Sequence, residues 1–142
     1  MKILLPIFSI LVFVGIIQGP DQGRPVSGTE EELIAGKTSK TWVTSKIYLN
    51  GVEVTGLNDP CNRNDLTIFY RDGKVLYEEG ATKCDPNDPD LIDQTKWQLS
   101  EDGQALIIGA KGNTKIVKLT PSEMILEEEQ EGTVFREHLK PV

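Results

Sequence analysis

Residues 61–84 read CNRNDLTIFYRDGKVLYEEGATKC, and the pair Asp72-Gly73 lies at their centre. Runs rich in β-branched, aromatic and other apolar residues flank this pair, which is typical of the two strands of a hairpin. An Asp-Gly pair favours a two-residue type I′ turn, because both central residues of that turn need a positive φ angle. Such a turn sets the strand register and predicts three facing pairs: Tyr70 with Val75, Phe69 with Leu76 and Ile68 with Tyr77.

Cys61 and Cys84 lie at equal distances on either side of the same turn. In the predicted register they face each other at the open end of the hairpin, so we expect a disulfide that joins two paired strands. The bond closes a loop of about 24 residues and, in the chain-entropy model, stabilises the fold by roughly 3 kcal/mol. The alternative is a pair of unrelated free thiols, which export of the protein disfavours.

The N-terminal segment has the features of a secretory signal peptide. Lys2 precedes a mainly apolar run, residues 3–17, that is shorter than a typical membrane span. We expect residues 1–19 to be a signal peptide and the protein to be exported, periplasmic or extracellular, with no stable membrane span. An uncleaved signal that acts as a weak anchor is the alternative. Residues 20–32 predict a flexible linker, and residues 33–142 predict one domain with a single core.

Acidic residues outnumber basic ones. The sequence has 22 Asp and Glu residues against 15 Lys and Arg residues, which gives a formal net charge of −7. A nucleic-acid-binding surface needs clustered basic side chains, and the sequence has no such stripe. We therefore predict no nucleic-acid partner.

Short runs of strand-forming residues recur along the domain between turn signals such as Asn50-Gly51. Before them, residues 30–35 predict one or two helical turns that end at Gly36. Short connections favour an antiparallel meander, which protects its edges by closing into a barrel or by stacking as a sandwich. We predict closure: an all-β, antiparallel up-and-down eight-stranded barrel with a short N-terminal helix. The expected strands are 41–49, 52–55, 66–70, 74–79, 95–99, 105–109, 114–119, 124–128 and 133–139.

A series of motifs extends over nearly the whole domain. It comprises Gly36-Lys37-Thr38 leading to Trp42, Asn50-Gly51, Cys61-x-x-Asn64-Asp65, Asp72-Gly73, Asp102-Gly103 and residues 66–69, 79–86, 97–100, 106–108 and 118–120. This series resembles the small secreted lipocalin-like domains of bacteria. The resemblance implies an eight-stranded barrel or near-barrel with an internal cavity. The chain departs from that family because no cysteine follows the leader, where many members look like lipoproteins. It departs from the Gly-x-Trp start of eukaryotic lipocalins in the wider spacing of Gly36 and Trp42.

The sequence has few residues that could form a catalytic site. His138 is the single histidine, and a Ser-His-Asp or Cys-His arrangement would need it beside a nucleophile. The acidic segment 85–90, with Asp93 beyond it, has oxygen ligands that suit calcium, but it lacks the glycine and the bidentate glutamate of an EF-hand loop. Prolines and Asx turns also explain its composition. We therefore predict no enzyme activity, no metal site and no cofactor.

Eight aromatic and aliphatic residues on the expected strands are candidates for a ligand-binding cavity. An eight-stranded barrel is wide enough either to be filled by its side chains or to hold one small ligand. We predict an exported, non-enzymatic domain that binds a small hydrophobic or amphipathic molecule in the barrel. The alternative is a structural module with a filled barrel, or one that binds a protein or glycan of the cell envelope. The candidate residues are Trp42, Tyr48, Ile68, Tyr70, Tyr77, Trp97, Ile107 and Met124.

Overall fold

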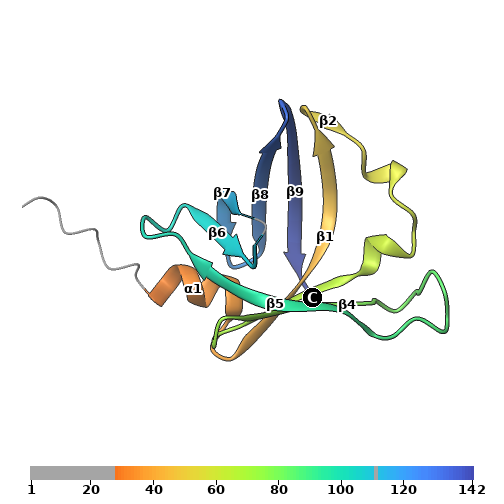
Figure 1. Ribbon diagram of the computed structural model, residues 1–142, viewed down its shortest axis with the longest axis horizontal. Coiled ribbons are helices and arrows are strands. Elements are labelled where there is room, and N and C mark those ends of the chain that lie inside the picture. The colour runs from red at the N-terminus through yellow and green to blue at the C-terminus, as the bar shows by residue number, and fades with distance from the viewer. Residues whose placement is uncertain (1–27, 111) are drawn as a thin grey trace, which may run out of the picture.

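The computed structural model describes residues 28–110 and 112–142 of the chain. It consists of one short helix beside a strongly curved sheet (Figure 1). The predicted signal peptide, and the predicted linker up to residue 27, lie outside the described residues. Residues 28–32 of that linker are helical, so the prediction of flexible coil is wrong for them. The elements are α1 (Gly28–Ala35), β1 (Ser39–Leu49), β2 (Val52–Glu53), β3 (Leu66–Tyr70), β4 (Lys74–Glu78), β5 (Leu91–Leu99), β6 (Ala105–Ile108), β7 (Asn113–Thr120), β8 (Glu123–Gln130), β9 (Thr133–Pro141) and the 3₁₀ turns η1 (Thr55–Leu57) and η2 (Asn62–Asn64).

The strands form one antiparallel sheet that closes into a barrel. From β3 to β9 each strand pairs with the next, β3 also pairs with β1, and β9 returns to pair with β1. β2 is a two-residue strand that pairs with the end of β1. The predicted all-β, up-and-down eight-stranded barrel with a short N-terminal helix is therefore confirmed.

Helix α1 lies against one end of the barrel and helps to close the core. It ends as predicted at Gly36, which has a left-handed φ of 62° and donates its N–H to the Glu32 carbonyl at 2.8 Å. The indole Nε1 of Trp42 on β1 donates a hydrogen bond to the Ile34 carbonyl at 2.8 Å. Ile34 and Trp42 have no exposed surface, so the packed core lies at the α1 end. In the described part of the chain, no helix is long and apolar enough to cross a bilayer.

The β3–β4 hairpin forms as predicted, but its register differs by one residue from the prediction. Phe69 lies opposite Val75, and Thr67 lies opposite Tyr77. Residues that lie directly opposite each other in an antiparallel pair project from the same face of the sheet. Because Phe69 and Val75 are both buried, Thr67 and Tyr77 also face the barrel interior.

The turn of this hairpin explains the difference. Gly73 has a φ of 87°, whereas Asp72 does not have a positive φ, so the turn is not the predicted type I′. Residues 71–73 form a three-residue loop with one left-handed glycine, a geometry that an Asp-Gly pair also fits. Oδ1 of Asp72 accepts a hydrogen bond from the Lys74 amide at 3.0 Å. A change of one residue in register moves the side chains of one strand to the other face relative to its partner.

The predicted disulfide between Cys61 and Cys84 is confirmed, with the two Cα atoms 5.1 Å apart. The prediction that the two cysteines lie on paired strands is wrong, because the β3–β4 ladder ends at Leu66 and Glu78. Cys61 directly precedes η2, and Cys84 lies in the connection between β4 and β5. The bond therefore joins two irregular segments beyond the open end of the hairpin.

A bulge at Ser45 interrupts the pairing of β1 with β9. Thr44 before the bulge lies opposite Leu139, and Ile47 after it lies opposite Glu137. Both pairs face the barrel interior, so the bulge preserves an inward face along the whole of β1. It also places Glu137 inside the barrel, where the site begins.

Candidate functional site

The barrel interior contains a cavity of about 190 Å³ on the far side of the core from α1. Leu126 and Leu139 belong to the buried core and also line this cavity, so the cavity begins where the packed core ends. The lining combines apolar and aromatic side chains with hydroxyl groups and two carboxylates. The lining residues are Thr67, Phe69, Tyr77, Ile108, Thr114, Leu126, Glu128, Phe135, Glu137 and Leu139.

A second recess, of about 370 Å³, adjoins the first. The two share Thr67, Tyr77 and Glu137, so they are parts of one hollow that reaches the surface. We call the first the inner cavity and the second the mouth. The remaining mouth residues are Thr44, Asp65, Leu66, Ile92 and Asp93.

The mouth lies where the barrel wall opens. β1 and β3 pair only as far as Val43 and Leu66, while β1 continues to Leu49 beside β9. Beyond that point β1 rises with β9 away from the layer formed by β3, β4 and β5 (Figure 1). Between the end of its pairing with β3 and its short pairing with β2, this part of β1 therefore borders an opening on the edge away from β9.

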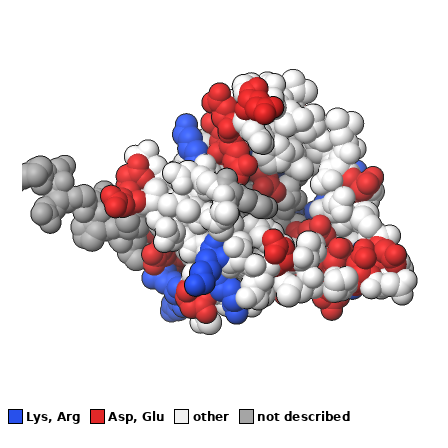
Figure 2. All heavy atoms as spheres, in the orientation of Figure 1, with Lys and Arg blue, Asp and Glu red and all other residues white. Residues whose placement is uncertain are grey.

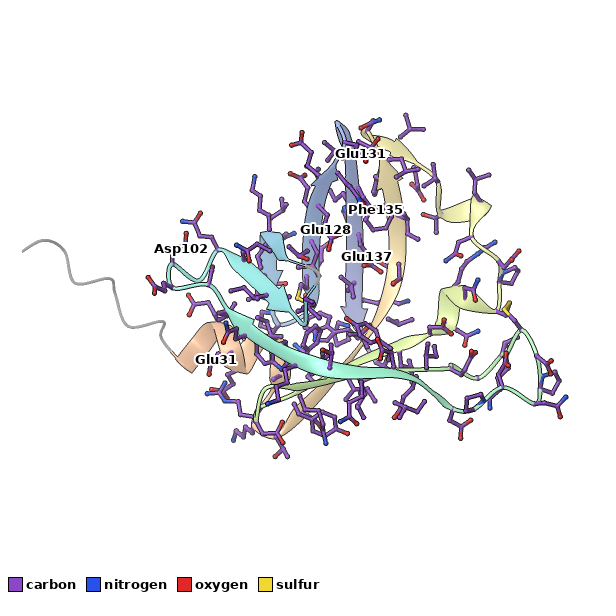
Figure 3. All side chains as sticks on the ribbon, viewed as in Figure 1. Glu31, Asp102, Glu128, Glu131, Phe135 and Glu137 are labelled. Carbon is purple, nitrogen blue, oxygen red and sulfur yellow. A yellow bond between two sulfur atoms is a disulfide. The ribbon has the colours of Figure 1, made fainter. Side chains whose placement is uncertain are left out.

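Two carboxylates enter the inner cavity from neighbouring strands, Glu128 on β8 and Glu137 on β9 (Figure 3). The Thr44 hydroxyl donates a hydrogen bond to Oε1 of Glu137. The Thr114 hydroxyl donates to Oε1 of Glu128 at 2.6 Å. Within the described residues neither carboxylate forms an ion pair, so both positions are held by neutral hydroxyl donors.

Burial and neighbouring negative charges raise the pKa values of Glu137 and Tyr77. Burial raises the pKa of Glu137 above its ordinary value of 4.5, and the charge of Glu128 raises it further, against the opposing effect of the Thr44 hydrogen bond. Burial also raises the pKa of the Tyr77 phenol, and the charges of Glu137, Asp93 and Glu128 add to that increase. Tyr77 therefore lies within electrostatic reach of carboxylates from three other strands.

The mouth has a further acidic group, Asp65. Burial raises its pKa, and a hydrogen bond from the Gly80 amide opposes the change. Its Oδ1 atom is buried and has no hydrogen-bond partner among the described residues. None of the described residues that line the inner cavity or the mouth is Lys, Arg or His. On the face of the molecule shown in Figure 2, acidic side chains flank a hollow.

Four of the eight predicted cavity residues face into the barrel, but only Tyr77 lines the inner cavity. Trp42, Trp97 and Met124 are buried in the packed core. The Trp97 ring packs edge-on against Phe69 with a centroid distance of 5.4 Å, and its Nε1 donates to the Tyr70 carbonyl at 2.9 Å. These three large side chains fill the α1 end of the barrel and form the floor beneath the cavity.

The other four predicted residues, Tyr48, Ile68, Tyr70 and Ile107, lie on the outer face of the barrel. Tyr48 packs against His138 there, with ring centroids 5.1 Å apart. Ile68 lies outside because of the one-residue difference in the hairpin register. Tyr70 and Ile107 each directly follow a buried, inward-facing residue on their strands. These four positions are not in the barrel interior, contrary to their proposed role as cavity residues.

Most of the residues that line the inner cavity are not among the eight candidates from the sequence. Phe135 and Glu137 alternate with Val134 and Arg136 in the sequence, and the structure places Phe135 and Glu137 on the inward face of β9. Glu128 lies in the acidic run 127–131, which is typical of a solvated turn, yet it is part of β8 and lines the cavity. The sequence pattern that indicates an inward face here is the spacing of Phe135 and Glu137, which are two residues apart on one strand. An aromatic side chain usually faces a core, so Glu137 on the same face is expected to point inward as well.

The remaining candidates from the sequence lie away from the cavity. His138 is on the outer face, with Nδ1 3.6 Å from Oε1 of Glu123. In the acidic segment, Lys83 pairs with Asp90 at 2.6 Å, and Oδ1 of Asp85 accepts hydrogen bonds from the backbone and side chain of Asn87. In the described ranges no three potential metal-ligating side chains lie together. An Asx turn at Asp85 and the Lys83–Asp90 ion pair hold this segment.

Comparison with models of known protein families gives no match, and no curated protein matches the chain either.

Proposed function

We propose that this protein is an exported, non-enzymatic, lipocalin-like domain that binds a small hydrophobic or amphipathic molecule inside its barrel. One observation carries the proposal: the closed barrel has a floor of packed side chains and, above it, an inner cavity with an opening at its mouth. Small-molecule sites are typically preformed, concave and mostly apolar, with a few polar groups that orient the ligand. The inner cavity combines these features.

The lining supports an amphipathic ligand in particular. Phe69, Leu126 and Leu139 provide apolar contact surface near the floor. Tyr77 and Glu137 lie where the inner cavity meets the mouth. A molecule with an apolar body and a polar end fits this gradient, with its body toward the core and its polar group toward the opening.

Export is supported by the Cys61–Cys84 disulfide, because disulfides persist in oxidising compartments and are rare in the cytosol. A lipocalin-like assignment is supported by the barrel order and by the motifs in the sequence. The non-enzymatic assignment rests on the chemistry of the lining, which includes no serine, cysteine or histidine among the described residues.

The test uses N-phenyl-1-naphthylamine, an uncharged fluorescent probe whose emission rises in an apolar site. We expect saturable binding to the oxidised protein with one probe per chain. Thr67→Trp should abolish binding, because Thr67 lines both the inner cavity and the mouth. Ile68→Trp is the matched control, since it places the same side chain on the same strand but on the outer face. Equal loss of binding in both variants, or no saturable binding by the wild type, would contradict the proposal.

A further inference from the structure

We propose that the barrel cavity selects a cationic amphiphile, an organic amine with an apolar or aromatic body whose ammonium group lies between Glu128 and Glu137. This inference rests on the proposed function and specifies the chemical class of the ligand. It follows from the arrangement of charge around the cavity.

Among the described residues, the carboxylates of Glu128 and Glu137 have no cationic partner. Glu128 and Glu137 project from adjacent strands into one cavity, and Glu137 accepts a hydrogen bond from Thr44 while Glu128 accepts one from Thr114. Within the described residues neither of the two forms an ion pair. Each is therefore held in position while an oxygen remains available to a ligand.

Burial of the Glu137 carboxylate without a cationic partner costs free energy. A carboxylate removed from water is destabilised unless a cation or several hydrogen bonds compensate it, and the charge of Glu128 makes ionisation of Glu137 harder still. An apolar side chain at position 137 would continue the lining formed by Leu126 and Leu139 without this cost. The side chain of Glu128 is exposed to solvent and adds to the cost at Glu137 through its charge. A buried carboxylate that faces a cavity without a cationic partner is typical of a functional site, and Glu137 fits a ligand that supplies the missing positive charge.

The surroundings of Glu128 and Glu137 are also acidic. Asp65 and Asp93 line the mouth, and none of the described lining residues is basic. These carboxylates attract a cation that reaches the mouth and repel a carboxylate or phosphate. Phe69, Tyr77 and Phe135 in the lining provide aromatic surface for the apolar body of such a ligand.

The experiment compares three probes with the same body: 4-phenylbutylamine, 4-phenylbutan-1-ol and 4-phenylbutyrate. Isothermal titration calorimetry with the oxidised protein at neutral pH measures each affinity directly. We expect the amine to bind about tenfold or more tightly than the alcohol, which is the size of effect of one charge-assisted hydrogen bond. The acid should bind more weakly than the alcohol.

The double variant Glu128→Gln/Glu137→Gln keeps the size of both side chains and removes their charge. It should bring the amine and the alcohol to similar affinities while binding of the alcohol is retained. Glu127→Gln is the matched control, because Glu127 is the neighbour of Glu128 on β8, faces outward and pairs with Arg136. This variant should keep the full preference for the amine.

The outcomes separate the two proposals. If the alcohol binds but the amine gains nothing over it, or the double variant keeps the preference, the inference about the cation is wrong and the proposed function stands. If none of the three probes binds, the proposed function fails and the inference fails with it.

Discussion

The hydroxyl of Thr44 on β1 donates a hydrogen bond to the carboxylate of Glu137 on β9, so the two strands that close the barrel share a polar contact inside it. Burial and Glu128 raise the pKa of Glu137 above 4.5. A carboxyl group with a raised pKa binds its proton more tightly in the folded state, so stability falls as pH rises from the unfolded pKa through the folded one. Glu137→Gln removes this loss and keeps an acceptor for Thr44.

We therefore expect the melting temperature of Glu137→Gln to be a few degrees higher than that of the wild type at pH 7. The difference in melting temperature should shrink toward about pH 4, where the carboxyl group of Glu137 becomes protonated and is as uncharged as the amide of the variant. Differential scanning calorimetry across this range measures it. Glu127→Gln is the control of opposite sign, because a hydrogen bond from Arg136 lowers the pKa of Glu127. A wild-type protein that is more stable than Glu137→Gln at pH 7 would contradict the account.

Gly80 lies so close to Asn64 that no side chain fits between them. A Cβ atom at position 80 would overlap Oδ1 and the carbonyl oxygen of Asn64, and Asn64 in turn hydrogen-bonds Thr82 through its side-chain amide. We expect Gly80→Ala to lower the free energy of unfolding by about 1–3 kcal/mol, as overpacking does elsewhere. Gly56→Ala, where nothing lies within 4 Å of the added atom, should change it by less than about 0.5 kcal/mol. Equal effects of the two substitutions in urea denaturation would refute this explanation.

The Cys61–Cys84 disulfide holds η2 against the connection between β4 and β5. Replacing both cysteines by alanine should lower the free energy of unfolding by about 2–4 kcal/mol, because the unfolded chain is then no longer closed into a loop and gains conformational entropy. Because the bond lies beyond the β3–β4 ladder, the circular dichroism spectrum of the folded variant should match that of the wild type. Mass mapping of the exported protein without reduction should recover the linked peptides, and two free thiols there would contradict the assignment.

Trp42 anchors helix α1 to the barrel through its indole N–H, which donates to the Ile34 carbonyl. Trp42→Phe removes the donor and leaves that carbonyl unpaired, which should cost about 1–3 kcal/mol. Hydrogen exchange should become faster across α1. Trp97→Phe is the comparison, because its indole donates to Tyr70 in the hairpin, so the faster exchange should appear there. Unchanged exchange of α1 in Trp42→Phe would rule out the anchoring role.

The strand pattern was readable from the sequence because β-branched and aromatic runs alternate with turn residues. β3 spans Leu66–Tyr70 as predicted, and the closed barrel follows from the short connections. The register of the β3–β4 hairpin was not readable, since Asp72-Gly73 fits two loop geometries that differ by one residue. The early start of β5 at Leu91 was also missed, because Asp93 and Gln94 hide the strand pattern.

The cavity was less accessible to sequence reasoning than the fold. Large apolar residues were the natural candidates, and Trp42 and Trp97 proved to be core residues that lie below the cavity. The acidic lining depends on which face of β8 and β9 is inward, and that is fixed by pairing across the barrel closure. Glu128 and Glu137 look like ordinary surface carboxylates until this closure is known.

The most direct test of the binding proposal locates the probe in the protein. Isotope-filtered nuclear Overhauser spectra of the complex with N-phenyl-1-naphthylamine report which methyl groups lie beside the probe. The account predicts contacts to Leu126 and Leu139 in the inner cavity. Contacts confined to Ile68 and Ile107 on the outer face would contradict it.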